Sequence, residues 1–145
     1  MVTWLDISNA YGSIPHKLIR KALESAHVSK EMIELISNYY CDPKIRFATK
    51  HFTTDWQKLE KGIITGCTLS VVLFTLTMTW LVLSAKKETK GPRSTSGQQQ
   101  ENSRLFMDDL NTTTETVVQT RYLLQKLEVI FDWAGLDFKQ EKCRV

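Results

Sequence analysis

Cysteine is scarce and widely spaced in this chain of 145 residues. The three cysteines are Cys41, Cys67 and Cys143, and an odd number at such separations fits neither a disulfide framework nor a zinc site. A reducing, intracellular compartment, cytoplasmic and/or nuclear, is therefore expected. The basic region and apolar run of a signal peptide are also missing, because Met1 leads directly into the strand-like segment 2–5.

The chain also lacks a large excess of either charge. Nineteen Lys and Arg against sixteen Asp and Glu give a net charge of +3, which permits a polyanionic partner without demanding one. The chain is 42% hydrophobic and 24% charged, which is ordinary for a globular protein and argues against general disorder. No internal repeat is visible, and the length predicts one domain over residues 1–145.

The longest stretch without a charged side chain is residues 62–85. A membrane span is one interpretation of such a run. Five threonines and two serines dilute its apolarity, however, and Gly62 and Gly66 stand at its start. A helix over residues 67–85, buried against a sheet, explains the run better, and no membrane is expected.

Hydrophobic periodicity and turn residues predict strands and helices in alternation. We expect a strand at 2–7, a helix from Pro15, a second helix capped by Ser29, a hairpin of 45–48 with 56–59 connected by 53–55, the helix 67–85, a flexible loop at 86–103, strands at 104–107 and 110–114, a helix over 117–134 closed by Gly135, and a last short strand at 136–138 or at the chain end. This order predicts an α+β fold of the split βαβ kind, with helices covering one face of the sheet.

Carboxylates stand at the ends of two predicted strands. Asp6 ends the first strand, and Asp108-Asp109 forms the tip of a hairpin after three apolar residues. Adjacent carboxylates repel each other, and Mg²⁺ or Mn²⁺ would relieve that repulsion. If neighbouring strands bring Asp6 and Asp108 together, they could hold two ions about 4 Å apart, as phosphoryl transfer requires. A solvated turn and a strand-end cap are the alternative.

Four segments, in order, resemble the motifs of a reverse transcriptase of the non-LTR (LINE-like) retrotransposon type. Residues 5–16 resemble motif A, 62–74 motif B, 106–110 the aromatic-x-Asp-Asp box of motif C, and 135–143 motif D. The resemblance covers nearly the whole chain. It implies a polymerase palm, an antiparallel sheet of the ferredoxin- or RRM-like kind backed by helices, and RNA-directed DNA synthesis from deoxynucleoside triphosphates on an RNA or DNA primer–template.

The resemblance also implies roles for single residues. Asp6 and Asp108 would be ligands of two Mg²⁺ ions, with Mn²⁺ as a substitute, and Asp109 would add charge beside them. Ile7 would contact the metal or the triphosphate through its backbone. Lys142 would lie near the pyrophosphate as a proton donor or charge stabiliser, with a solvated surface lysine as the alternative.

Nucleotide selection would fall to three more residues. Tyr11 stands where the family has an aromatic gate against the ribose 2′-hydroxyl, although a core aromatic beside the helix is the alternative. Gly66 would let template or nucleotide approach the backbone, and Thr65 precedes it. Ser70 and Phe74 are expected to orient and pack the helix.

The chain departs from the family pattern at three positions. Thr65 replaces the usual Gln, Val71 the usual Pro, and Gly12 a second Asp that many relatives carry. The first departure puts one contact to the incoming nucleotide in doubt. A further group of basic residues, Lys86, Lys87, Lys90 and Arg93, could contact phosphates, or could be a solvated part of the loop 86–103.

The sequence thus predicts the palm part of a retrotransposon reverse transcriptase. The alternative is a catalytically inactive remnant, or a domesticated palm that only binds nucleic acid or protein. The family's upstream fingers and downstream thumb are not recognisable in the chain, so its partners would include the remaining fingers and thumb of the full-length polyprotein. In isolation it should polymerise weakly or not at all.

Overall fold

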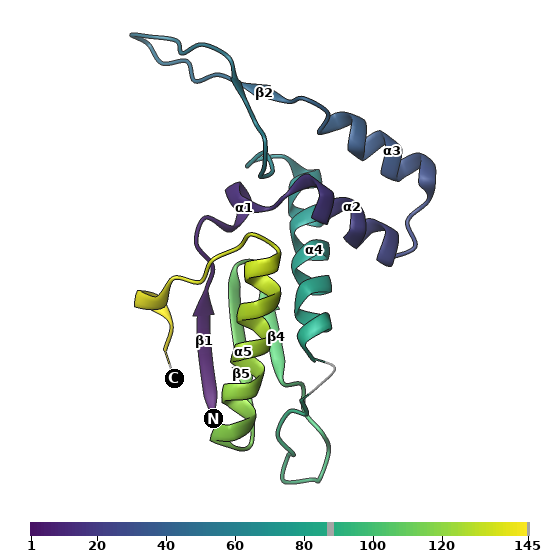
Figure 1. Cartoon of the computed structure of the whole chain (residues 1–145), viewed down its shortest axis with the longest axis vertical. Coiled ribbons are helices and arrows are strands. Elements are labelled where there is room, and N and C mark those ends of the chain that lie inside the picture. Colours follow the sequence, from purple (N-terminus) through teal and green to yellow (C-terminus); the bar gives the residue numbers. More distant parts are fainter. Residues whose placement is uncertain (87–88, 145) are drawn as a thin grey trace.

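The computed structural model describes residues 1–86 and 89–144 and contains a three-stranded antiparallel sheet in the lower half of the view in Figure 1. The strand order is β1-β5-β4, where β1 is Val2–Asp6, β4 is Ser103–Phe106 and β5 is Asp109–Thr113. The predicted α+β fold, an antiparallel sheet backed by helices, is confirmed.

Side-chain alternation gives this sheet a buried face and an open face. In β1, Thr3 and Leu5 are buried, whereas Val2 and Trp4 are about half exposed. The core beneath the buried face contains side chains with no exposed surface, which include Leu110 of β5. The open face ends in Asp6, which therefore lies at the rim of the sheet and not in the core.

The uncharged run forms the long helix α4, Thr68–Lys86, close to its predicted bounds. It is long and apolar enough to cross a membrane by these two criteria alone. It contacts α2, α5 and β4, and the side chains of Leu73, Phe74, Met78 and Leu81 are almost completely buried. These contacts are those of a core helix, as the sequence predicted.

Helix α5, Val117–Trp133, is fixed at both ends by local hydrogen bonds. Thr116 and Gln119 form a capping box at its start. At its end the Leu136 amide donates to Phe131 O and the Gly135 amide to Asp132 O, with Gly135 at φ +72°. This Schellman turn needs a residue that tolerates positive φ, and it directs the chain back towards β1.

The segment after α5 lies along the free edge of β1 without forming the predicted strand. Isolated bridges join Ile7 to Phe138 and Trp4 to Arg144. Between them a 3₁₀ turn, η1 (Gln140–Lys142), interrupts the pairing. The prediction of a continuous strand at 136–138 or at the chain end was therefore wrong, because this turn takes the residues between the two bridges out of the ladder.

Three helices connect β1 to the rest of the chain. These are α1 (Ala10–Ser13), α2 (His16–Ser25) and α3 (Lys30–Tyr39). The Ser29 hydroxyl accepts a hydrogen bond from the Met32 amide, so the predicted cap is confirmed. The short α1 was not predicted; it begins after Asn9, whose left-handed backbone (φ +42°) turns the chain out of β1.

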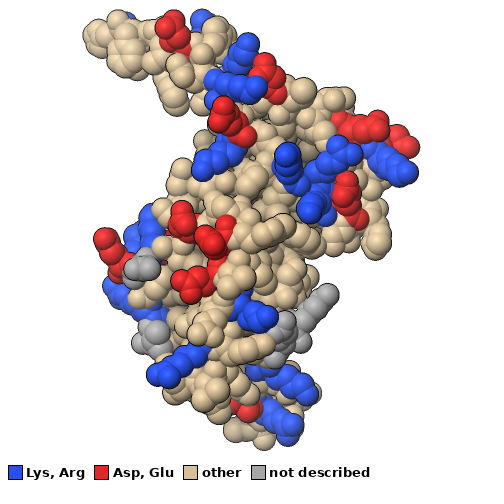
Figure 2. Space-filling view, in the orientation of Figure 1, with Lys and Arg blue, Asp and Glu red and all other residues tan. Residues whose placement is uncertain are grey.

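A hairpin projects from this layer, away from the rest of the molecule (Figures 1 and 2). We call residues 44–58 the arm; its stem consists of β2 (Lys44–Ile45) paired with β3 (Gln57–Lys58). The bridge between Ala48 and Thr53 and the Thr49 amide bonded to Phe52 O place the tip at 49–52. The sequence predicted the hairpin but placed its tip at 53–55, because Thr-Thr-Asp resembles a turn.

Candidate active site

Asp6 pairs with β5 at the rim of the sheet. The register pairs Asp6 with Asp109, and Asp109 with Phe106 of β4. Asp108 precedes Asp109 in the connecting turn, and both carboxylates are exposed. The structure thus brings Asp109 directly opposite Asp6, with Asp108 one residue further along.

The hairpin of motif C turns one residue earlier than predicted. Its two loop residues are Met107 and Asp108, and Asp109 already belongs to β5. Met107 has φ +53°, a left-handed conformation that costs energy in a residue with a bulky side chain. The predicted Asp108-Asp109 turn was wrong, because pairing Asp109 with Asp6 in the ladder leaves Met107 to make the turn.

Two lysines surround the Asp6 carboxylate. Lys142 Nζ lies 3.3 Å and Lys139 Nζ 3.7 Å from Asp6 Oδ2. That oxygen is buried and accepts no hydrogen bond of good geometry in the described part of the chain, so the lysines compensate its charge without satisfying it. Asp6 is thus a carboxylate with acceptor capacity left for a further cation.

Sequence reasoning identified Lys142 but missed Lys139. The Lys142 amide donates to Lys139 O within the turn at η1. Side chains three residues apart eclipse each other in 3₁₀ geometry, which brings both ammonium groups to one carboxylate. The signal was the Lys-x-x-Lys spacing, but it has this meaning only if the segment is a 3₁₀ turn.

A pocket of about 360 Å³ lies at this rim of the sheet. Asp6, Asp109 and Lys142 line it, together with Trp4 and Arg144. Among residues 1–86 and 89–144, no three side chains of ligand type gather closely enough to enclose a metal. Mg²⁺ keeps several waters and is held by one or two carboxylates plus substrate phosphates, and the unsatisfied Asp6 oxygen fits such a cation.

Tyr11 joins motifs A, B and C. Its ring stacks on Phe74 of α4, with centroids 4.2 Å apart and planes 10° apart, and its hydroxyl donates to Met107 Sδ at 3.8 Å. The side chain is half-buried and packs against the core, so the packing interpretation is supported. The gate against a ribose hydroxyl stays a prediction.

The first residues of motif B rest on the helix of motif A. The Ile63 amide donates to Tyr11 O, and the Gly62 amide to Ile14 O. A Cβ on Gly62 would come within 2.7 Å of Gly12 O. The close approach of these two segments therefore requires glycine at position 62.

Thr65 and Gly66, in contrast, are exposed at the turn before α4. Gly66 has φ +86° and open space where a Cβ would be. Ser70 and Phe74 are buried, and the Ser70 and Tyr40 hydroxyls are 3.2 Å apart, which confirms their packing role. Nucleotide contacts of Thr65 and Gly66, and a backbone role of the buried Ile7, stay predictions.

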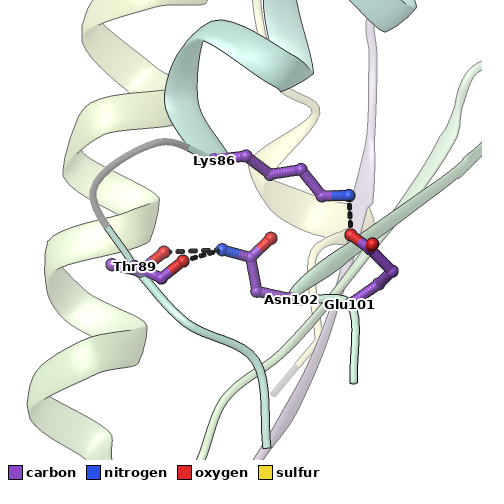
Figure 3. Close-up of polar contacts among 4 residues, drawn as sticks. All are labelled: Lys86, Thr89, Glu101 and Asn102. Carbon is purple, nitrogen blue, oxygen red and sulfur yellow. Dashed lines mark hydrogen bonds and ion pairs between the residues drawn. The ribbon is translucent and has the colours of Figure 1, made fainter. Parts of the chain in front are cut away.

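The predicted basic group lies at the other end of the sheet, where the loop enters β4 (Figure 1). Lys86 forms an ion pair with Glu101, and the Asn102 amide group donates to Thr89 (Figure 3). The hydrogen bond and charge of Lys86 lower the pKa of Glu101 below its usual range. Lys86 is therefore already paired and not brought to the carboxylate rim.

Arg93 is an exposed residue of the same loop. Its amide donates to Glu115 Oε1 at 2.9 Å, and it forms an isolated bridge with Gln99. Lys87 lies outside the described residues. Phosphate binding by this group stays a prediction, and so does the flexibility of the loop.

Comparisons with known proteins agree with this geometry. Residues 1–145 match the family described as reverse transcriptase (RNA-dependent DNA polymerase). The chain is 28% identical over 139 residues to a retrovirus-related Pol polyprotein from the type-1 retrotransposable element R2 of Nasonia vitripennis, and 26% identical over 139 residues to that of the type-2 element R2DM of Drosophila melanogaster. Each match covers 96% of this chain but 13% of the polyprotein.

Solved structures show the same fold. An apo telomerase from Candida tropicalis, truncated from its C-terminal domain, superposes with a TM-score of 0.72 over 99% of this chain and 30% of its own, at 11% identity. A telomerase from Candida albicans in complex with an RNA fragment gives a TM-score of 0.62 over 99% of this chain and 26% of its own, also at 11% identity. With the family match over every residue, the predicted resemblance to non-LTR enzymes is confirmed, and this chain belongs to the reverse transcriptase (RNA-dependent DNA polymerase) family.

Proposed function

We propose that this chain is the palm part of an RNA-directed DNA polymerase from a retrotransposon. It would transfer nucleotides from deoxynucleoside triphosphates to a primer 3′-hydroxyl on an RNA or DNA template. The observation that carries the proposal is the juxtaposition of Asp6, Asp109 and Lys142 around one pocket, with an unsatisfied Asp6 oxygen. Since the chain spans 13% of the length of the R2 polyproteins it matches, the remaining fingers and thumb are proposed partners.

In this mechanism the primer oxygen bonds to the α-phosphorus while the bond to the pyrophosphate oxygen breaks. Asp6 and Asp108 would hold two divalent cations, Mg²⁺ or Mn²⁺, and Asp109 would add negative charge beside them. When bound, such cations activate the attacking hydroxyl and stabilise the leaving oxygen. Asp6 and Asp109, fixed in a hydrogen-bonded ladder, supply the negative charge in a preorganised position.

The other residues of the rim would position and select the nucleotide. Lys142 is 64% exposed at its side chain, so it can leave Asp6 and donate a proton or positive charge to the departing pyrophosphate. Tyr11, held between Phe74 and Met107, would crowd a 2′-hydroxyl. Thr65 and Gly66 stand open at the start of α4, where they could contact the incoming nucleotide.

An inactive palm that only binds nucleic acid or protein is the second candidate. Thr65 favours the inactive palm, because its side chain is shorter than the Gln of many relatives and puts one contact to the incoming nucleotide in doubt. The ion pairs of Lys139 and Lys142 with Asp6 also favour it, since the lysines lie where a cation would bind. The two candidates differ in one measurable property, metal-dependent nucleotide incorporation.

The test is incorporation of deoxynucleotides by the full-length parent on poly(A)–oligo(dT), with Mg²⁺ or Mn²⁺. Asp6→Asn and Asp108→Ala should each lower incorporation by about 100-fold or more, because even outer-shell partners of a metal contribute 10- to 100-fold. Asp132→Asn, an exposed carboxylate on α5, is the matched control and should retain activity. The catalytic proposal would be contradicted if the full-length parent incorporates no deoxynucleotide, or if Asp108→Ala leaves its incorporation unchanged.

A further inference from the structure

The arm carries three exposed aromatic side chains. Phe47, Phe52 and Trp56 are 64%, 62% and 60% exposed, although aromatic side chains of this size normally bury most of their surface. The arm stands clear of the helices that cover the sheet (Figure 1). Its aromatic rings therefore do not stabilise the core, and they are accessible to a partner.

Backbone pairing holds the arm as a ladder. The Thr54 amide donates to Phe47 O, and the Thr49 amide to Phe52 O. Since alternate residues of a ladder share a face, this pairing places Phe47 and Phe52 on the same side. Two rings on one side of a ladder form a platform on which flat groups can stack.

Positive charge accompanies these rings. The arm contains four Lys or Arg residues and one carboxylate, so its excess of three positive charges equals the net charge of the whole chain. Lys44 and Lys58 lie within 4 Å of Asp42. In the described part of the chain, no carboxylate forms an ion pair with Arg46 or Lys50, so both are free for an anionic ligand.

One basic residue is already placed against a ring. Arg46 lies over Trp56, with its guanidinium carbon 4.7 Å from the ring centroid. Such a cation–π pair keeps the ring oriented and its second face available. Trp56 is thus an ordered platform with a positive charge beside it.

We propose that the arm binds a single strand of nucleic acid, with bases stacked on its aromatic rings and phosphates on Arg46 and Lys50. Alternating rings and unpaired cations are what unpaired strands require, since every base has a stacking face and every nucleotide a charge. Aromatic residues and Arg are also common in protein interfaces, but lysine is depleted there, and the arm contains three lysines. The inference deepens the proposed function, because a templated polymerase must hold an unpaired strand, but binding can be tested without catalysis.

The test is fluorescence anisotropy of a labelled 12-nucleotide oligo(dT) or oligo(U) with the 145-residue chain. Trp56→Ala should weaken binding by at least about fivefold, the lower limit for loss of one stacked base. Trp56→Phe, which retains a ring, should stay within about twofold of the parent sequence. Trp133→Ala is the matched control, because Trp133 is 61% exposed and also lies beside a cation, Lys21 at 5.6 Å.

Charge is tested through the dependence of affinity on salt. Replacing both Arg46 and Lys50 by Ala should lower the slope of log affinity against log salt by about 1.4, or about 0.7 for each lost phosphate contact on a single strand. Arg121→Ala, an exposed arginine on α5, should leave the slope unchanged. Circular dichroism should show all variants folded, since the replaced side chains lie outside the core.

Equal losses in Trp56→Ala and Trp133→Ala, or no loss in either, would overturn the proposal. So would sedimentation showing that Trp56→Ala abolishes self-association while oligonucleotide binding is unchanged, because the arm would then be a protein interface. Failure of the proposed catalytic function can be distinguished from failure of the arm proposal. If only the catalytic function fails, the full-length parent incorporates no nucleotide, whereas the arm variants still lose affinity for the oligonucleotide.

Discussion

Lys142 Nζ lies 3.3 Å from Asp6 Oδ2, and this is the oxygen that a catalytic cation would bind. An ammonium group and a divalent cation compete for the same charge. Lys142→Ala should therefore tighten Mn²⁺ binding to the isolated chain by about 1.5- to 5-fold, which corresponds to the small free energy of an exposed ion pair. Titration followed by electron paramagnetic resonance measures it.

Lys90→Ala is the control for that titration, since it removes an exposed lysine at the far end of the sheet. Unchanged or weaker Mn²⁺ binding in Lys142→Ala would show that the lysine does not compete with the cation. In the full-length parent the same variant should lower incorporation, because Lys142 is proposed to assist the departing pyrophosphate.

Two substitutions of Tyr11 distinguish its role in packing from its proposed role in selecting deoxynucleotides. Tyr11→Phe keeps the stack on Phe74 and loses only a weak hydrogen bond to sulfur, so the free energy of unfolding should change by less than about 0.5 kcal/mol. Tyr11→Ala removes a half-buried ring and should cost about 2–3 kcal/mol. Urea denaturation measures both variants.

The same two variants test the gate in the full-length parent. Tyr11→Ala should raise the ratio of ribonucleotide to deoxynucleotide incorporation, whereas Tyr11→Phe should not. Equal ratios in the two variants would leave Tyr11 a packing residue only.

Two glycines of motif B with nearly equal φ give a matched pair. Gly62 has φ +89° and Gly66 φ +86°, but only a Cβ on Gly62 would meet backbone atoms, with Gly12 O at 2.7 Å. Gly66→Ala should cost about 1–2 kcal/mol from backbone strain alone. Gly62→Ala should cost more, because motif B must also move away from motif A. Equal unfolding free energies would contradict the contact.

A pH-dependent ion pair joins the stem of the arm to Asp42, just before it in the chain. Lys58 Nζ lies 2.8 Å from Asp42 Oδ1, and this hydrogen bond and charge lower the pKa of Asp42 below its usual 3.8. Because the pKa is lower in the folded state, the pair stabilises the stem above pH 3.8. Its contribution is lost as the pH falls through the folded-state value. In Lys58→Gln the pKa of Asp42 should move back up towards 3.8, as measured by NMR titration, and no movement would contradict the pairing.

Periodicity and caps predicted the long elements because these depend on local chemistry. Helix α5 has a capping box at Thr116 and a Schellman turn at Gly135, and both are encoded in adjacent residues. The turn of motif C was misplaced because Asp is typical of turns, whereas the actual turn uses Met107 in a left-handed conformation that only the cross-strand pairing explains.

At the rim of the site, too, the arrangement depends on contacts between distant segments that local sequence does not encode. Asp6 and Asp109 could be selected from the sequence, but which carboxylate faces Asp6 depends on register, and register is a property of two strands together. Lys139 was missed because its approach to Asp6 requires the 3₁₀ turn. The aromatic residues of the arm follow a pattern that a half-buried strand would share, so their exposure became visible only in the structure.

The bridges of β1 to Phe138 and Arg144 have a consequence for biosynthesis. Asp6 is translated before its partners Asp109 and Lys142, which lie more than a hundred residues later in the chain. Contacts of such sequence separation form slowly, and β1 cannot pair with β5 until that strand has also left the ribosome. Its unpaired edge must stay protected through that interval, and the site exists only when synthesis of these 145 residues is nearly finished.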